Sequence, residues 1–291
     1  MWSVNGSVSK LLLETGITSM RLSQFRASAA WLILFIVVVA TNRAALKMHG
    51  WKEFRLIALY GILGVTMTQW LYFVGIQLLP VGVALIIEFT APLMVALWVR
   101  FAWSFAIPRL TWLGLFVALA GLVFITEAWN GFTLNVLGVL ASAGAAAALA
   151  LYYLAGEKVL HQERPRDPLS LTMWGFAFAA MFWAVVQPWW DFPWEYFQGT
   201  ISPWGEKSVA LPRVGLVTWM VVLGTVVPFW LGLVALRHIS SQQASATGMT
   251  EPVMASLVAW LVMGELLSGW QIIGGAITLS GIFLAEWARS R

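Results

Sequence analysis

The sequence predicts an all-α membrane protein whose ten transmembrane helices form two inverted repeats of five helices each. Three observations predict this fold class: the composition, the length of the apolar stretches and an internal repeat. Of the 291 residues, 60% are hydrophobic and 10% are charged, whereas a soluble domain is about one-quarter charged. So few charged residues cannot cover a large surface in water, and the chain is therefore predicted to cross a membrane several times.

Apolar stretches of about 20 residues, the length that a membrane helix needs, follow one another along the chain. Residues 1–13 are apolar over only part of that length. Nine residues precede Lys10, whereas an apolar lead-in of 24 residues precedes Lys158, which lies 148 residues later. We therefore expect the chain to begin within a first span whose opening turns are missing. The complete spans are predicted at residues 24–42, 54–78, 81–102, 110–129, 134–157, 169–188, 213–236, 242–263 and 269–288.

A shift of 160 residues aligns the chain with itself without a gap from about residue 61 to residue 125. The two copies are predicted at residues 1–129 and 134–288. A unit with an odd number of spans begins and ends on opposite sides of the membrane, so its second copy enters upside down. Inverted repeats of this kind are typical of secondary transporters. Pairs that match at this shift include Trp70 with Trp230, Thr90 with Thr250, Pro92 with Pro252, Gly114 with Gly274 and Gly121 with Gly281.

The basic residues of the predicted loops indicate the orientation. Twelve fall on the side of the N-terminus, and four fall on the other side: Arg21, Arg26, Lys207 and Arg213. Lysine and arginine are enriched in cytoplasmic loops. Both termini are therefore predicted to be cytoplasmic, and a count of nine spans would break the alternation that gives this bias.

Several kinds of chemistry have no sequence support. The chain has no cysteine, its three histidines are scattered, and neither H-E-x-x-H nor G-x-S-x-G occurs. We therefore expect no enzyme activity, no metal site and no cofactor. The net charge of +4 comes from basic residues dispersed among the spans, which argues against a nucleic-acid partner.

The second half carries a recognisable pattern, TEPVMASLVAWLVMGELLSGWQIIGGAITLSGIFL, at residues 250–284. It resembles the E-P…G-E…Q-x-x-G…G signature of the EamA family of the drug/metabolite transporter superfamily. The first half departs from that signature, because Ala91 replaces the glutamate and no G-E pair follows. The residues that carry the resemblance are Glu251, Pro252, Gly264, Glu265, Gln271, Gly274 and Gly281.

The resemblance implies a ten-helix exporter with cytoplasmic termini and a central cavity between its halves. Members of that family are similar to exporters of amino acids and related metabolites, and they lie in the inner membrane of bacteria. The expected partners are a small-molecule substrate and membrane lipid, and the expected assembly is a monomer or a weak homodimer.

Glu88 and Glu251 are the strongest candidate site residues. A carboxylate in the middle of a span costs about 2.5–3.5 kcal/mol on insertion scales, so it normally faces a cavity or a partner. Placed on one continuous helix, the two glutamates occupy equivalent faces of the fourth and ninth spans, about one turn apart. We expect them to bind a substrate ammonium group, to carry protons, or both; the alternative is hydrogen bonding that only packs helices together.

Pro92 and Pro252 are predicted to break these two spans, because proline removes a backbone donor and frees a carbonyl of the preceding turn. Broken helices often line transporter binding sites. Other polar or aromatic residues within spans are expected near the cavity, although lone aromatic residues more often only pack. They are Asn5, Gln69, Tyr72, Tyr152, Tyr153 and Trp230.

The aromatic residues of the long connection at 188–212 are predicted to lie in the headgroup zone of the membrane. The function predicted for the chain is secondary active export of amino acids or related small metabolites by alternating access, driven by proton exchange. The leading alternative is a carrier of the same superfamily for a cationic drug, a nucleotide-related metabolite or a lipid-linked precursor. A channel and a membrane-embedded enzyme are the remaining rivals.

Overall fold

The computed structural model describes residues 2–129, 135–162, 164–201, 210–263 and 267–289. Most of that length is helical, and a short antiparallel pairing joins β1 (Thr200–Ile201) to β2 (Leu211–Pro212). The N-terminal part contains α1 (Trp2–Glu14), α2 (Ser19–Thr41), α3 (Trp51–Leu59), α4 (Met67–Leu78), α5 (Val81–Glu88), α6 (Ala91–Phe101) and α7 (Arg109–Ile125). The C-terminal part contains α8 (Val136–Leu160), α9 (Pro168–Val186), α10 (Arg213–Val221), α11 (Val227–Leu236), α12 (Ser241–Gly248), α13 (Glu251–Met263) and α14 (Gly269–Arg289).

Seven helical stretches of the described chain are long and apolar enough to cross a membrane, which confirms the predicted multi-pass, all-α class. α7 is a shorter apolar helix of 17 residues, and α1, α12 and α13 are shorter than a full span. The count of ten spans stays a prediction. The seven long stretches are Ser19–Thr41, Trp51–Leu78, Val81–Phe101, Val136–Leu160, Pro168–Val186, Arg213–Leu236 and Gly269–Arg289.

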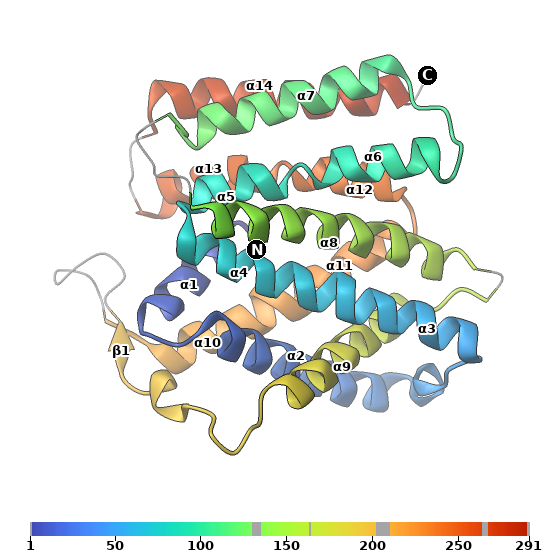
Figure 1. Ribbon diagram of the computed structural model, residues 1–291, viewed down its shortest axis with the longest axis vertical. Coiled ribbons are helices and arrows are strands. Elements are labelled where there is room, and N and C mark those ends of the chain that lie inside the picture. The colour runs from blue at the N-terminus through green and yellow to red at the C-terminus, as the bar shows by residue number, and fades with distance from the viewer. Residues whose placement is uncertain (1, 130–134, 163, 202–209, 264–266, 290–291) are drawn as a thin grey trace.

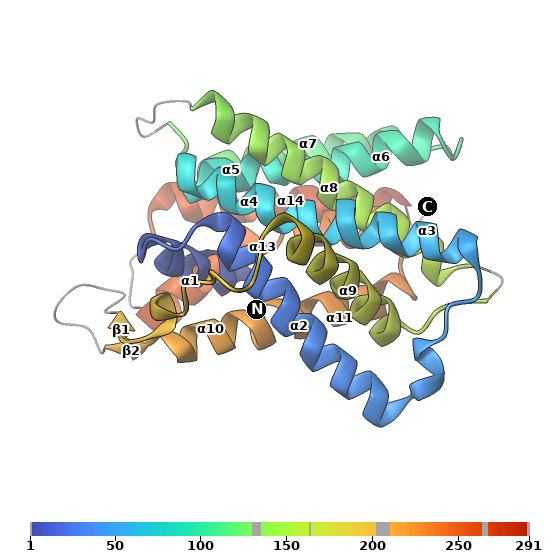
Figure 2. The same cartoon turned by 60° about the horizontal axis from the view of Figure 1, so that its bottom comes forward.

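The helices are arranged in layers (Figure 1). α7 and α14 lie side by side at one edge, and the α5–α6 and α12–α13 segments form the next layer. α2 and α9 pack against each other on the opposite side of the molecule, as the turned view also shows (Figure 2). Helices that are far apart in sequence therefore meet throughout the fold.

Glycines bring α7 and α14 into backbone contact. A Cβ added to Gly114 would lie 2.6 Å from the carbonyl oxygen of Gly281, and one added to Gly274 would lie 2.7 Å from that of Gly121. No side chain larger than hydrogen fits at such a distance. Gly114 thus meets Gly281 while Gly121 meets Gly274, so the two helices run antiparallel.

Two long helical stretches contain a π-helical turn at matching positions. The Met67 N–H donates to the Ile62 carbonyl within the turn Tyr60–Thr66, and the Val227 N–H donates to the Val222 carbonyl within the turn Val222–Val226. Both hydrogen bonds span five residues, and they lie 160 residues apart. The first turn packs against α8 and α9, and the second packs against α1 and α2. Such turns are frequent at functional sites.

The α5–α6 and α12–α13 segments are each interrupted immediately before a proline. α5 ends at Glu88 and α6 begins at Ala91, while α12 ends at Gly248 and α13 begins at Glu251. Because Pro92 has no N–H, the Glu88 carbonyl lacks its usual donor four residues later. Each carboxylate lies on a different side of an equivalent break, because Glu88 precedes the break in its segment and Glu251 follows the break in the other.

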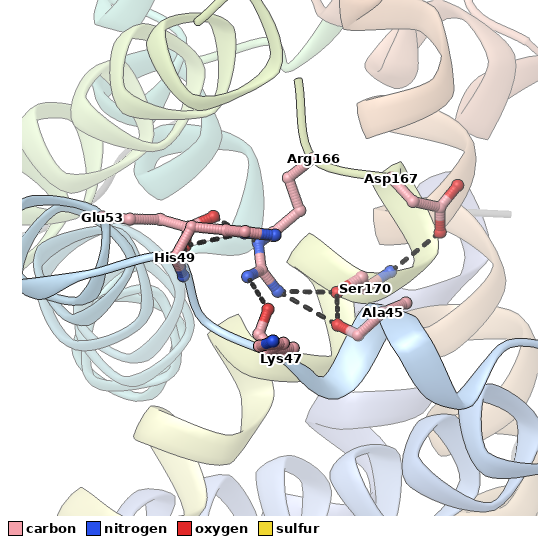
Figure 3. A network of polar contacts seen from close by, with 7 residues as sticks. All are labelled: Ala45, Lys47, His49, Glu53, Arg166, Asp167 and Ser170. Carbon is pink, nitrogen blue, oxygen red and sulfur yellow. Dashed lines mark hydrogen bonds and ion pairs between the residues drawn. The ribbon is translucent and has the colours of Figure 1, made fainter. Parts of the chain in front are cut away.

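A buried arginine ties two connections together at one end of the molecule (Figure 3). Arg166, just before α9, donates from Nε to Glu53 Oε1 of α3 at 2.8 Å. Its other nitrogens donate to the Lys47 carbonyl at 2.7 Å, the Ala45 carbonyl at 3.2 Å and Ser170 Oγ at 2.8 Å. This arginine clasp, Arg166 with Glu53, Ala45, Lys47 and Ser170, joins the α2–α3 connection to the start of α9.

The aromatic connection between α9 and α10 folds onto α2. The Phe25 ring lies 4.6 Å from Phe197 and 5.9 Å from Phe192, centroid to centroid, and both partners are buried. Arg21 Nη2 forms an ion pair with Asp191 Oδ1 at 2.7 Å. Part of the predicted headgroup segment therefore packs against α2, whereas Trp190 remains exposed.

Candidate functional site

A cavity with an empty volume of about 710 Å³, partly open to solvent, lies among helices from both halves of the chain. The N-terminal part contributes Asn5, Gly6, Arg26, Thr68, Gln69, Tyr72, Leu85, Glu88 and Phe89. The C-terminal part contributes Leu149, Tyr152, Tyr153, Phe229, Gly248 and Glu251.

The two glutamates that the sequence singles out both line this cavity. Glu88, the last residue of α5, is 8% exposed, and Glu251, the first residue of α13, is partly exposed. Among the described residues, no lysine, arginine or histidine nitrogen lies within 4.0 Å of either carboxylate. Neither glutamate is therefore used up in an ion pair, and both are available to a cation or a proton.

Aromatic side chains from α8 and α11 form one wall of the cavity. The Tyr152 ring lies 5.3 Å from Tyr153 and 5.4 Å from Phe229, centroid to centroid, and both pairs are close to perpendicular. The Tyr152 hydroxyl donates to the Phe229 carbonyl at 3.4 Å. Edge-to-face pairs of this kind are stabilising, so the three rings support one another in the wall.

Two buried amide side chains of the cavity lack partners within the described part of the chain. Gln69 leaves both its amide oxygen and its amide nitrogen without a hydrogen bond, and Asn5 leaves its amide oxygen without one. Buried polar groups are nearly always hydrogen-bonded, and an unsatisfied one costs about 1–3 kcal/mol. A polar ligand or water in the cavity would supply the missing partners.

Trp230 is the predicted site residue that does not line the cavity. Its side chain is 38% exposed, whereas its neighbour Phe229 is buried against Tyr152. Successive residues of an α-helix point about 100° apart. Position 229 takes the inward face of α11, so position 230 is turned toward the surface of the bundle.

We expect Phe229→Ala to weaken substrate binding and Trp230→Ala to leave it unchanged, because only the first shortens the cavity wall. Truncation of a buried phenylalanine to alanine costs about 3–5 kcal/mol in lost packing. We expect part of this loss to appear as a weaker binding free energy of the substrate. The measurement is the substrate dissociation constant of each purified variant in detergent. Equal loss of affinity in both variants would contradict this assignment of the wall.

Arg26 and Thr68 line the cavity although the sequence did not point to them. Arg26 is counted above among loop residues, but it lies eight positions into α2 and is 3% exposed. Its position within a long apolar helix is the signal that could have identified it. Thr68 donates to the Gly64 carbonyl at 2.5 Å, as threonine commonly does within membrane helices, and has no comparable signal.

The motif that carries the family resemblance is largely structural beyond Glu251 and Pro252. Gln271 caps α14 reciprocally with Ser268: the Gln271 N–H donates to Ser268 Oγ at 3.1 Å, and the Ser268 N–H donates to Gln271 Oε1 at 3.0 Å. Gly274 and Gly281 permit the contact with α7. Gly264 and Glu265 lie outside the described residues.

Known proteins resemble this chain over nearly all of its length. The profile of the EamA-like transporter family matches residues 1–127 and 136–287. The uncharacterized transporter YdfC of Bacillus subtilis is 23% identical over 267 residues, which cover 92% of this chain and 81% of YdfC. The threonine/homoserine exporter RhtA of Escherichia coli K12 is 26% identical over 233 residues, which cover 78% of this chain and 70% of RhtA.

A solved crystal structure shares the fold. It superimposes with a TM-score of 0.73 at 18% sequence identity, and the match covers 99% of this chain and 95% of the other. The likeness extends over the whole bundle, including the helices that line the cavity. The family profile matches both halves of the chain, and the relatives and the fold are consistent with this match. The chain therefore belongs to the EamA-like transporter family.

Proposed function

We propose that the protein exports amino acids or related small metabolites across the bacterial inner membrane by alternating access, driven by proton exchange. The observation that carries this proposal is the cavity, in which Glu88 and Glu251 from opposite halves lie without basic partners within 4.0 Å among the described residues. The relationship to RhtA, a threonine/homoserine exporter, favours amino acids as the substrate class.

Alternating access would arise from two inverted five-helix repeats. The π-helical turns and the breaks before Pro92 and Pro252 recur at a shift of 160 residues, and so do the glycines of the α7–α14 contact. Gly114 meets Gly281, and Gly121 meets Gly274, so each position contacts the counterpart of the other, as a two-fold relation requires. Two related halves of this kind can rock against each other around a fixed site.

The proposed topology places both termini in the cytoplasm, in keeping with the loop charges. In this arrangement a monomer contains a complete cavity, since both halves of one chain supply its lining residues. We therefore propose that the monomer, alone or in a weak homodimer, is the transporting unit.

The test is efflux of labelled amino acid from liposomes that contain the purified protein. We expect an inwardly directed proton gradient to accelerate the efflux of at least one amino acid, and an unlabelled form of the same amino acid to compete. A current without counterflow would instead indicate a channel, and the absence of any amino-acid flux would overturn the proposal.

A second candidate function is the export of organic cations, because the cavity has two carboxylates against the one guanidinium of Arg26. The same liposomes distinguish the two. Competition by the lipophilic cation tetraphenylphosphonium, with no competition by any amino acid, would favour this second candidate.

A further inference from the structure

We propose that Arg26 binds the carboxylate of the substrate while Glu88 and Glu251 face its ammonium group, so that the cavity selects zwitterions over amines that lack a carboxylate. The assignment rests on the proposed function and names the residue that would make the site specific for amino acids.

Arg26 is held in place by the other half of the chain. Its Nε donates to Thr225 Oγ1 at 2.5 Å, and its Nη2 donates to the Gly224 carbonyl at 3.1 Å. Both acceptors lie in the π-helical turn Val222–Val226. The guanidinium carbon also lies 5.4 Å from the centroid of the Phe73 ring. The side chain is thereby fixed in orientation before any ligand arrives, which lowers the entropic cost of binding.

The two hydrogen bonds leave part of the guanidinium unused. An arginine has five N–H donors, and Nη1 takes part in neither bond to the turn. Within the described residues, no carboxylate oxygen lies within 4.0 Å of Arg26. A buried charge is costly unless it is paired, and a carboxylate is the anion that best matches the geometry of a guanidinium.

The charges of the cavity are arranged as a zwitterion requires. Arg26, Glu88 and Glu251 line the same cavity, yet Arg26 forms no ion pair with either glutamate in the described chain. Opposite charges that line one cavity without closing on each other leave room for a molecule that carries both signs.

Two unsatisfied amides line the same cavity as this arginine. A Cβ added to Gly224 would lie 2.7 Å from Asn5 Cγ, so Asn5 packs on the same turn that Arg26 binds. The amide oxygen of Asn5 and both amide atoms of Gln69 have no hydrogen-bond partner among the described residues. A bound amino acid offers donors at its ammonium group and acceptors at its carboxylate, which would satisfy both kinds of atom.

Two structural roles would compete with this assignment. Arg26 could serve only to tie α2 to the π-helical turn, or only to offset the two carboxylates. In either case its replacement would change the binding of ligands with and without a carboxylate alike. Selective loss of carboxylate recognition is therefore the distinguishing result.

The experiment compares L-threonine, L-leucine and L-phenylalanine, each beside its carboxamide, by competition binding to the purified full-length protein. For an amino acid that binds, we expect the wild type to prefer the free acid over the amide by at least about tenfold, the value of one charge-assisted hydrogen bond. Arg26→Gln should abolish that preference by weakening the acid, with binding of the amide changed by less than about twofold. Arg26→Lys should retain part of the preference.

Thr225→Val is the matched control. It removes the acceptor of Arg26 Nε but keeps the guanidinium, so the preference for the acid should persist. Equal binding of acid and amide by the wild type would overturn the assignment and would indicate a carrier of amines. This comparison uses the wild-type protein alone, so it does not depend on whether a variant folds. Equal weakening of both ligands in Arg26→Gln would overturn it as well. Failure of the wild type to bind any of the six compounds would overturn the proposed amino-acid function itself, and the assignment with it.

Discussion

Glu251→Gln is expected to abolish the response of amino-acid efflux to a proton gradient while leaving the protein folded. Glutamine has nearly the same size and can form hydrogen bonds, but it cannot take up or release a proton. Glu251 lines the cavity at the first position of α13 and has no described basic partner within 4.0 Å, so the change breaks no ion pair. The measurement is the efflux rate from liposomes with and without a proton gradient, for which we expect at least about a tenfold loss of stimulation.

Glu88→Gln, measured in the same way, shows which of the two carboxylates carries the proton. Glu14→Gln is the matched control, because Glu14 is an exposed carboxylate at the end of α1 and does not line the cavity. We expect the control to respond to the gradient as the wild type does. A normal response in both Glu88→Gln and Glu251→Gln would exclude the pair from proton coupling.

Arg166→Met is expected to destabilise the protein more than any substitution on its surface. The arginine side chain is 4% exposed and the side chain of its partner Glu53 is 10% exposed. Its loss leaves Glu53 Oε1 and the Lys47 carbonyl without their donor, whereas the Ala45 carbonyl still accepts from Ser170 Oγ at 2.6 Å. Breaking a buried ion pair by removing one partner costs about 3–5 kcal/mol. The measurement is the thermal unfolding midpoint in detergent, which should fall by several degrees.

Arg55→Met is the control for the arginine clasp, because Arg55 lies on the exposed face of α3, two residues after Glu53. We expect a change below about 0.5 kcal/mol for this surface residue. The double variant Arg166→Met with Glu53→Leu should regain part of the lost stability, since it removes the carboxylate that the single variant leaves without its guanidinium partner. A double variant as unstable as the sum of both single variants would show that the two residues act independently.

The sequence alone determined the class of the protein and its family. The low charge content and the apolar stretches predicted a multi-pass helical protein, and the described helices confirm this, with bounds equal or close to those predicted for stretches such as Arg213–Leu236 and Pro168–Val186. The pattern at residues 250–284 indicated the family that the profile match then established. These properties could be predicted because span length, hydropathy and short motifs depend only on neighbouring residues in the sequence and not on tertiary contacts.

Only the tertiary structure decided which side chains share the cavity. Glu88 and Glu251 attract attention in the sequence because an isolated carboxylate in an apolar span is costly. Arg26 lies within the predicted span 24–42 as well, but so near its start that it is assigned to the loop; α2 begins at Ser19, which places Arg26 well inside the helix. Trp230 illustrates the reverse case, since it matches Trp70 in the repeat but takes the outward face of α11. The direction of a side chain depends on the rotation of its helix, which packing against distant helices sets.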